Sequence, residues 1–279
     1  MGEETQPEIK AILDSQSYVL AERDTALLAR AELRPVRLQL ELLKPEMALS
    51  EHNISSTIVV FGSTRIAQRS ELESRLRAAQ AALATRPGDP RLAREVSRVE
   101  RLLAKDHYYE AAREFSRIVS SRSQPNGKHL VIITGGGPGI MEAANRGAHD
   151  VGAESIGLNI TLPNEQLPNA YITPRLCFRF HYFALRKMHF LLRAQALVAF
   201  PGGFGTLDEL FDALALRQTH RMQEIPIILF AREYWRKVID FQFLADEGVI
   251  ADEDLELFSY AETPEEIWSL IAGFHDFQP

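Results

Sequence analysis

Five short runs of apolar, largely β-branched residues constrain the fold of this chain more than any other feature. They are Thr57–Phe61, Leu130–Thr134, Ser155–Ile160, Ala196–Phe200 and Ile225–Phe230. The runs are continuous rather than alternating, which is typical of strands that are covered on both faces in a parallel sheet. Segments with helical patterns separate them, so we predict an α/β fold with a doubly wound parallel sheet. A weaker run at Leu257–Tyr260 predicts a sixth strand, before a final helix that Thr263 caps.

Two stretches do not fit this pattern. Residues 1–50 are polar and helical in pattern and have no strand signal, so we expect an N-terminal helical extension. Residues 69–106 carry two apolar stripes with a 4-3-4 spacing, separated by the helix-breaking turn Thr85–Pro90, which predicts a helical hairpin. We therefore expect a single domain over residues 51–279, with the hairpin inserted after its first strand. The stripes should pack on the body of the protein or on a neighbouring subunit.

Charge and cysteine content exclude several classes of protein. The chain has 31 basic and 38 acidic residues and a net charge of −7, which gives no general attraction to nucleic acid or to an anionic membrane. The chain contains no run of about 18 apolar residues, so no membrane-spanning helix is predicted. The single cysteine, Cys177, excludes an intramolecular disulfide and a multi-cysteine zinc site. We expect a cytoplasmic protein without nucleic-acid or membrane partners.

A first glycine-rich turn follows the second apolar run. Gly135, Gly136 and Gly137 let the backbone turn and expose its N–H groups before a helix that begins near Ile140. Such a helix start favours a bound anion. Ile140 stands where a dinucleotide-binding signature has its last glycine, so that signature is not met. A tight strand-to-helix turn without any ligand remains an alternative.

A second glycine-rich turn follows the fourth apolar run. Gly202, Gly203 and Gly205 allow close approach of a ligand to the backbone, and Thr206 stands where a helix should start. A phosphate would fit between these N–H groups and the Thr206 hydroxyl. Both turns lie at carboxyl ends of predicted parallel strands, so they predict a shared ligand crevice.

Glu209 and the Arg186-Lys187 pair allow two interpretations each. Thr206 and Glu209 have the spacing of a capping box, which would make the glutamate structural. Alternatively, Glu209 acts on a ligand, and Arg186 is the cation that keeps it ionised beside a phosphate. Arg186 and Lys187 could equally form a solvated basic turn.

Taken together, these motifs resemble the LOG ("lonely guy") family, whose members were formerly labelled possible lysine decarboxylases. The resemblance rests on Thr134–Asn145, Arg186-Lys187 and Pro201–Glu209, with support from Phe61–Arg65. It implies a Rossmann-like fold, a homodimer or larger even homo-oligomer, and no metal or cofactor. It also implies hydrolysis of the N-glycosidic bond of a purine nucleoside 5′-monophosphate, either AMP or a cytokinin riboside monophosphate. The products would be a free base and ribose 5-phosphate.

The resemblance assigns roles to individual residues. Arg186 and Glu209 take the family's catalytic positions. Nucleotide or phosphate binding is expected from the remaining motif residues, which are Ser63, Gly135, Gly136, Gly137, Lys187, Gly202, Gly203, Gly205 and Thr206. One departure leaves the recognised base open, because Phe183 and Ala184 stand where smaller members carry Met-His.

Two other functions are possible. Rossmann-like proteins related to the family carry molybdenum cofactor, so a non-catalytic binder of a nucleotide or phosphorylated cofactor is the first alternative. The second is pyridoxal-phosphate-dependent lysine decarboxylation, which would need a lysine able to form a Schiff base. Lys187 is the one lysine close to a motif.

Overall fold

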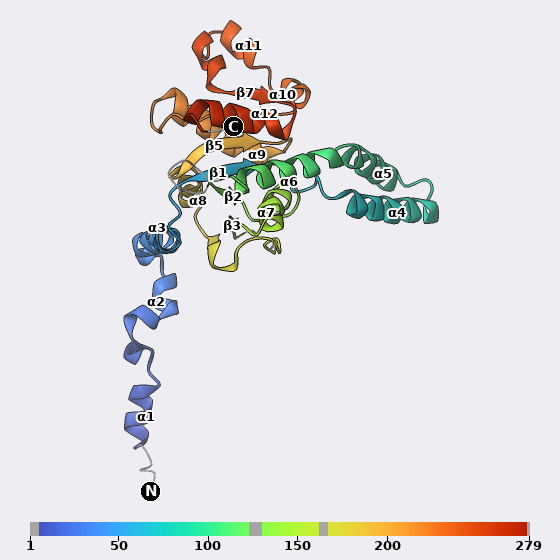
Figure 1. Ribbon diagram of the computed structural model, residues 1–279. Coiled ribbons are helices and arrows are strands. Elements are labelled where there is room, and N and C mark those ends of the chain that lie inside the picture. Colours follow the sequence, from blue (N-terminus) through green and yellow to red (C-terminus); the bar gives the residue numbers. More distant parts are fainter. Residues whose placement is uncertain (1–5, 123–129, 162–166, 278–279) are drawn as a thin grey trace.

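Seven parallel strands form one sheet in the computed structural model, which describes residues 6–122, 130–161 and 167–277 (Figure 1). The strand order is β4-β3-β2-β1-β5-β6-β7. The strands are β1 (Thr57–Phe61), β2 (Val131–Thr134), β3 (Ser155–Ile160), β4 (Cys177–Phe180), β5 (Ala194–Ala199), β6 (Ile227–Phe230) and β7 (Ser259–Ala261). All paired neighbours run parallel, so the predicted doubly wound α/β fold is confirmed.

Helices connect the strands and precede them. The α-helices are α1 (Pro7–Leu13), α2 (Thr25–Ala29), α3 (Arg34–Glu51), α4 (Arg69–Thr85), α5 (Pro90–Leu103), α6 (Asp106–Ser120), α7 (Ile140–Asp150), α8 (Phe183–Leu191), α9 (Phe204–Gln218), α10 (Arg232–Val238), α11 (Phe241–Asp246) and α12 (Pro264–His275). Short 3-10 helices are η1 (Gln16–Tyr18), η2 (Ala21–Arg23), η3 (Ala31–Leu33), η4 (Pro174–Leu176) and η5 (Asp252–Leu257). No helix in the described ranges is long and apolar enough to cross a membrane.

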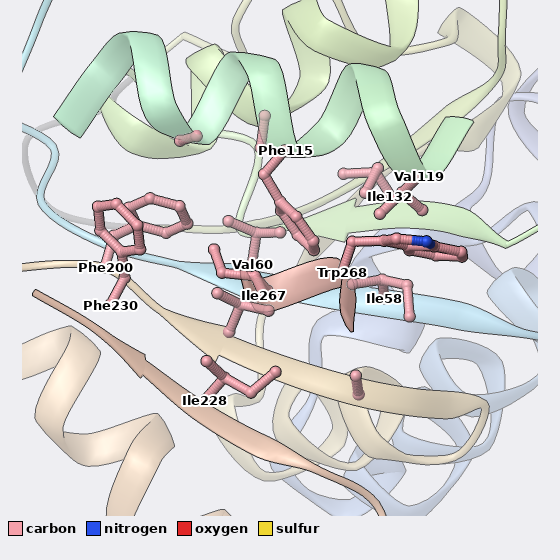
Figure 2. Close-up of a cluster of buried hydrophobic side chains, with 14 of the residues drawn as sticks. Ile58, Val60, Phe115, Val119, Ile132, Phe200, Ile228, Phe230, Ile267 and Trp268 are labelled. Atoms are coloured by element: carbon pink, nitrogen blue, oxygen red, sulfur yellow. The ribbon is translucent and has the colours of Figure 1, made fainter. Parts of the chain in front are cut away.

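Each face of the sheet is covered by helices, which explains the continuous apolar runs. Ile58 and Val60 of β1 pack on one side with residues of α6, α7 and α12. Figure 2 shows this cluster, in which Phe115 of α6 packs over the sheet. Val59 of β1 points to the other side, where α3, α8, α9 and α10 contribute buried residues such as Phe190. Successive residues of one strand thus fill two cores.

The five strong runs are strands β1, β2, β3, β5 and β6, and the weak run is β7. The sequence did not predict β4. That strand lies at the edge of the sheet, and its four residues alternate between burial and exposure around the exposed Arg179. Thr263 caps α12, because its hydroxyl accepts a hydrogen bond from the Glu266 N–H at 3.1 Å.

Both segments outside the sheet pattern are helical. Helix α3 packs on the sheet, whereas the helices before it and the hairpin extend away from the sheet. Helices α1 and α2 point away from the body at one end, and α4 and α5 project to one side as a pair (Figure 1). Leu72 of α4 and Val99 of α5 are buried, one from each stripe. Asp89 caps α5 through the Arg91 N–H. We retain the division into residues 1–50 and a single domain over 51–279 as a proposal.

Candidate active site

A cavity of about 620 Å³ opens at the carboxyl ends of the central strands. Strand β1 lies between β2 and β5. Strands β2 to β4 are added on one side of β1 and strands β5 to β7 on the other, so the strand order reverses at β1. Ligands of open α/β sheets bind at such a switch point. The walls come from the segments after β1, β2 and β5 together with the end of β3 and the first turn of α8.

The segment after β1 connects the two glycine turns. The Ser63 N–H donates to the Pro201 carbonyl at 3.0 Å, and the Ser63 carbonyl accepts from the Ile140 N–H at 3.0 Å. Ser63 therefore contacts both turns through its backbone, and it lines the cavity.

The first glycine turn is held by a conformation that favours glycine and by contacts from outside. Gly136 has φ +72°, and a Cβ there would lie 2.2 Å from Asn159 Oδ1. The Asn169 N–H donates to the Gly136 carbonyl at 2.9 Å, and Asn169 Nδ2 donates to the Gly137 carbonyl at 3.1 Å. Gly135 and Gly137 line the cavity, whereas Gly136 does not.

The second glycine turn leaves open space beside its backbone. A Cβ added at Gly203 or Gly205 would meet nothing within 4 Å, and both residues line the cavity. Gly202 is different, because a Cβ there would lie 2.1 Å from Thr206 Oγ1, and Gly202 is not a lining residue. Thr206 is buried at the cavity wall. The turn thus has room for a ligand where its backbone faces the cavity.

Helix α9 begins one turn earlier than the capping-box interpretation requires. Its N-cap is Gly203, without a side-chain cap, so Thr206 lies inside the helix and does not form a capping box with Glu209. The structural interpretation of Glu209 is therefore wrong. The first N–H groups of α9 have no helical acceptor, and they present the positive end of the helix dipole to the cavity.

Glu209 and Arg186 meet in a buried position at this cavity. Arg186 Nη1 lies 3.7 Å from Glu209 Oε1, and the two side chains are 13% and 9% exposed. Arg186 Nε donates to the Leu158 carbonyl at 2.7 Å, so the guanidinium is held by β3. A Cβ at Gly135 would lie 2.6 Å from Arg186 Nη2, and glycine at that position leaves room for the arginine.

Burial controls the charge of Glu209. It raises the pKa of Glu209 from 4.5 to about 7, although Arg186 and Lys187 act to lower it. Asp208 and Asp212 on the same helix add to the rise. Arg186 thus favours the ionised form of Glu209, as expected, but loss of solvent has the larger effect and acts in the opposite direction. A carboxyl group with such a pKa can take up or release a proton near neutral pH.

Lys187 does not line the cavity. Its Nζ atom pairs with Asp208 Oδ1 at 2.9 Å and with Asp212 Oδ2 at 3.6 Å, both on α9. The structure thus brings most of the predicted site residues around one cavity. Those that line it are Ser63, Gly135, Gly137, Arg186, Gly203, Gly205, Thr206 and Glu209. Gly136, Gly202 and Lys187 are not among the lining residues.

Several lining residues were not predicted from the sequence. Arg65 is exposed, and within the described ranges its guanidinium has no hydrogen-bond or ion-pair partner. Arg65 could have been predicted as a lining residue, because it comes just after the apolar run that forms β1. Phe204 is 92% exposed and Phe183 is 50% exposed. Asn159 lines the wall at the end of β3.

The site offers no evident metal ligands or reactive thiol in the part of the chain that the structure describes. Groups of three or more His, Cys, Asp or Glu residues that could hold a metal ion are absent there. Cys177 is half-buried, and burial raises the pKa of its thiol, which disfavours the nucleophilic thiolate.

The sheet and the cavity at its switch point define a Rossmann-like α/β protein with a ligand site between two glycine turns. The family model described as "Possible lysine decarboxylase" matches residues 141–271. Cytokinin riboside 5′-monophosphate phosphoribohydrolase LOG3 of Arabidopsis thaliana is 26% identical over 167 residues, covering 58% of this chain and 74% of that protein. Probable cytokinin riboside 5′-monophosphate phosphoribohydrolase LOGL2 of Oryza sativa subsp. japonica is 26% identical over 179 residues, covering 63% and 68%. These matches confirm the resemblance to the LOG family.

Among solved structures, the molybdenum cofactor binding protein from Rippkaea orientalis aligns with a TM-score of 0.46 and 17% identity. That alignment covers 79% of this chain and 97% of the other.

Proposed function

We propose that this protein is a phosphoribohydrolase that cleaves the N-glycosidic bond of a purine nucleoside 5′-monophosphate, releasing the base and ribose 5-phosphate. The observation that carries the proposal is a buried Glu209, with a pKa of about 7, beside Arg186 in a cavity that also receives the start of α9. The names of the curated relatives support this class of reaction.

The phosphate is bound at the start of α9. Phe204, Gly205 and Thr206 carry backbone N–H groups without a helical acceptor, and the helix dipole favours an anion at this end. Arg65 supplies a cation at the same cavity, and in the part of the chain that the structure describes no carboxylate pairs with it. Binding energy at this non-reacting end of the nucleotide orients the ribose for reaction.

Glu209 acts at the anomeric carbon. Cleavage of an N-glycoside builds positive charge on the ribose ring, and an ionised carboxylate beside the ring stabilises that charge. Water supplies the hydroxyl group that bonds to the anomeric carbon while the bond to the base breaks. Glu209 accepts the proton of this water, and the proton finally goes to the departing base. A well-placed general base contributes about 10²–10⁴-fold to the rate.

Aromatic side chains at the cavity suit a planar base. Phe183 and Phe204 both line the cavity and are largely exposed, so their ring faces are available for stacking. AMP and a cytokinin riboside monophosphate are the two substrates that we propose. From the resemblance we also propose a cytoplasmic homodimer or larger even homo-oligomer.

Lysine decarboxylation is not supported by the site. None of the described lysines lines the cavity, and Lys187 is engaged by two aspartates of α9. A Schiff base with a cofactor would need a free amine at the site.

The proposal is tested by incubating the protein with AMP and with isopentenyladenosine monophosphate and separating the free base by chromatography. We expect base release by the wild type and none above background by Glu209→Gln, which should still bind nucleotide by calorimetry. Glu224→Gln is the matched control, because Glu224 is exposed, precedes β6 at the amino ends of the strands and does not line the cavity. Nucleotide binding by the wild type without release of base would refute the enzyme and favour a non-catalytic binder.

A further inference from the structure

Helix α3 lies against α8, the helix that carries Arg186, and buried residues of both belong to the same core. It precedes the region that the family model matches. Its polar contacts to the α8 region are concentrated at two carboxylates, Glu41 and Glu46.

Glu41, from a distant part of the chain, holds the two residues that lead into α8. Its two carboxylate oxygens accept hydrogen bonds from the N–H groups of His181 at 2.8 Å and Tyr182 at 3.1 Å. Tyr182 is the N-cap residue of α8 and provides no side-chain cap of its own. A carboxylate at this position satisfies exposed N–H groups and interacts favourably with the helix dipole. Arg37 Nε adds a bond to the Tyr182 hydroxyl at 3.1 Å.

Glu46 holds the other end of α8. Its carboxylate accepts two hydrogen bonds from the Arg193 guanidinium, at 2.5 and 2.7 Å. Arg193 also donates to the Ile54 carbonyl at 3.2 Å. Between the two ends, the ring of the buried His189 lies 3.3 Å from the Glu41 carbonyl and 3.3 Å from the Glu46 carboxylate. Paired hydrogen bonds between arginine and a carboxylate fix orientation as well as distance.

We propose that Glu41 and Glu46 are positioning residues, through which α3 holds both ends of α8 and so sets the place of Arg186 relative to Glu209. The inference deepens the proposed function and rests on it for the role of this pair. Arg186 is one helical turn from the capped end of α8, and its separation from Glu209 is 3.7 Å, too long for a hydrogen bond. A small displacement of α8 therefore changes the attraction that Glu209 feels.

Loss of the contacts between α3 and α8 should therefore change the pKa of Glu209. The charged groups that act on it are Arg186 and Lys187 from α8 and Asp208 and Asp212 from α9. Release of α8 withdraws the two cations, which raises the pKa of Glu209, and admits solvent to a buried carboxyl, which lowers it. Glu41 is not among the groups that act on Glu209, so loss of its charge without movement of α8 should leave this pKa unchanged. A shift in either direction thus reports movement of α8.

The test is a carboxyl carbon NMR titration of the full chain, with the Glu209 signal assigned by its loss in Glu209→Gln. In Glu41→Ala we expect the pKa of Glu209 to shift by roughly 0.5–1 from its wild-type value. Glu51→Ala, an exposed position on the same helix, should leave it unchanged. Glu41→Gln keeps one acceptor and should give an intermediate value. A folded Glu41→Ala protein with an unchanged Glu209 pKa would overturn the proposal.

A second variant and a second readout keep the test decisive. If Glu41→Ala does not fold, Glu46→Gln is titrated in the same way, and an unchanged Glu209 pKa would again count against positioning. Where the wild type releases base, the acidic limb of the pH profile of kcat should shift in Glu41→Ala in the same direction as the NMR value. Absence of base release by the wild type would refute the proposed function alone, because the titration needs no turnover.

Discussion

The burial of Glu209 predicts that Glu209→Gln makes the protein more stable, and increasingly so as pH rises. The pKa of this carboxyl is 4.5 without the fold and about 7 within it. Between these values the unfolded chain ionises while the folded protein keeps its proton, so the wild type loses stability as pH rises through this window. The full loss is about 3 kcal/mol above pH 8, because one pKa unit corresponds to about 1.4 kcal/mol. Glutamine has the shape of the protonated carboxyl and no proton to lose.

The quantity to measure is the difference in free energy of unfolding between Glu209→Gln and the wild type, from urea titrations at pH 5 and pH 8.5. The linkage relation gives a difference that is about 2.5 kcal/mol larger at the higher pH. For a chain of this size this corresponds to a relative rise in Tm of roughly 5–10 °C. Glu224→Gln should show no such pH dependence, because Glu224 is exposed. Equal differences at the two pH values would refute the claim that burial dominates the charge state of Glu209.

Two further predictions concern the walls of the cavity. Arg65→Ala should raise KM for a nucleoside monophosphate about 10-fold or more, since a charged hydrogen bond contributes about 1.5–3 kcal/mol. The free energy of unfolding should change little, because Arg65 is exposed. An unchanged KM in steady-state assays would exclude Arg65 from phosphate binding. Gly136→Ala should lower the free energy of unfolding by about 1–3 kcal/mol more than Gly152→Ala in urea titrations. Both glycines have φ +72°, but only at Gly136 would a Cβ meet Asn159, so equal losses would show that this contact is not limiting.

The parallel sheet could be predicted because its signal is local. Each central strand is buried on both faces, so burial alone makes its residues apolar, as in Ile58–Val60 of β1. Strand β4 lacks that signal, since it lies at the edge and exposes Arg179 between two buried phenylalanines. The first glycine turn was recognisable because φ values such as +72° at Gly136 favour glycine.

The site could be predicted only as far as its residue types allowed. The place of Arg186 and Glu209 beside one cavity followed from the motifs, but the charge of Glu209 did not. Its pKa depends on how much solvent the fold removes, which spacing in the sequence does not reveal. The start of α9 at Gly203 was also missed, because Thr206 and Glu209 imitate a capping box. Arg65 was missed as a lining residue, since only the sheet brings its segment beside the second glycine turn.

The contacts of α3 with α8 have a consequence for the order in which the chain can fold. Glu41 and the N–H group of His181 are 140 positions apart, and Glu46 and Arg193 are 147 apart. Such pairings form late, because a long stretch of chain must be closed before they contribute. During synthesis, α3 leaves the ribosome well before its partner helix exists. The protein therefore completes the ion pair between Glu46 and Arg193 only after most of the sheet has been made, and α3 is among the last helices to find its place.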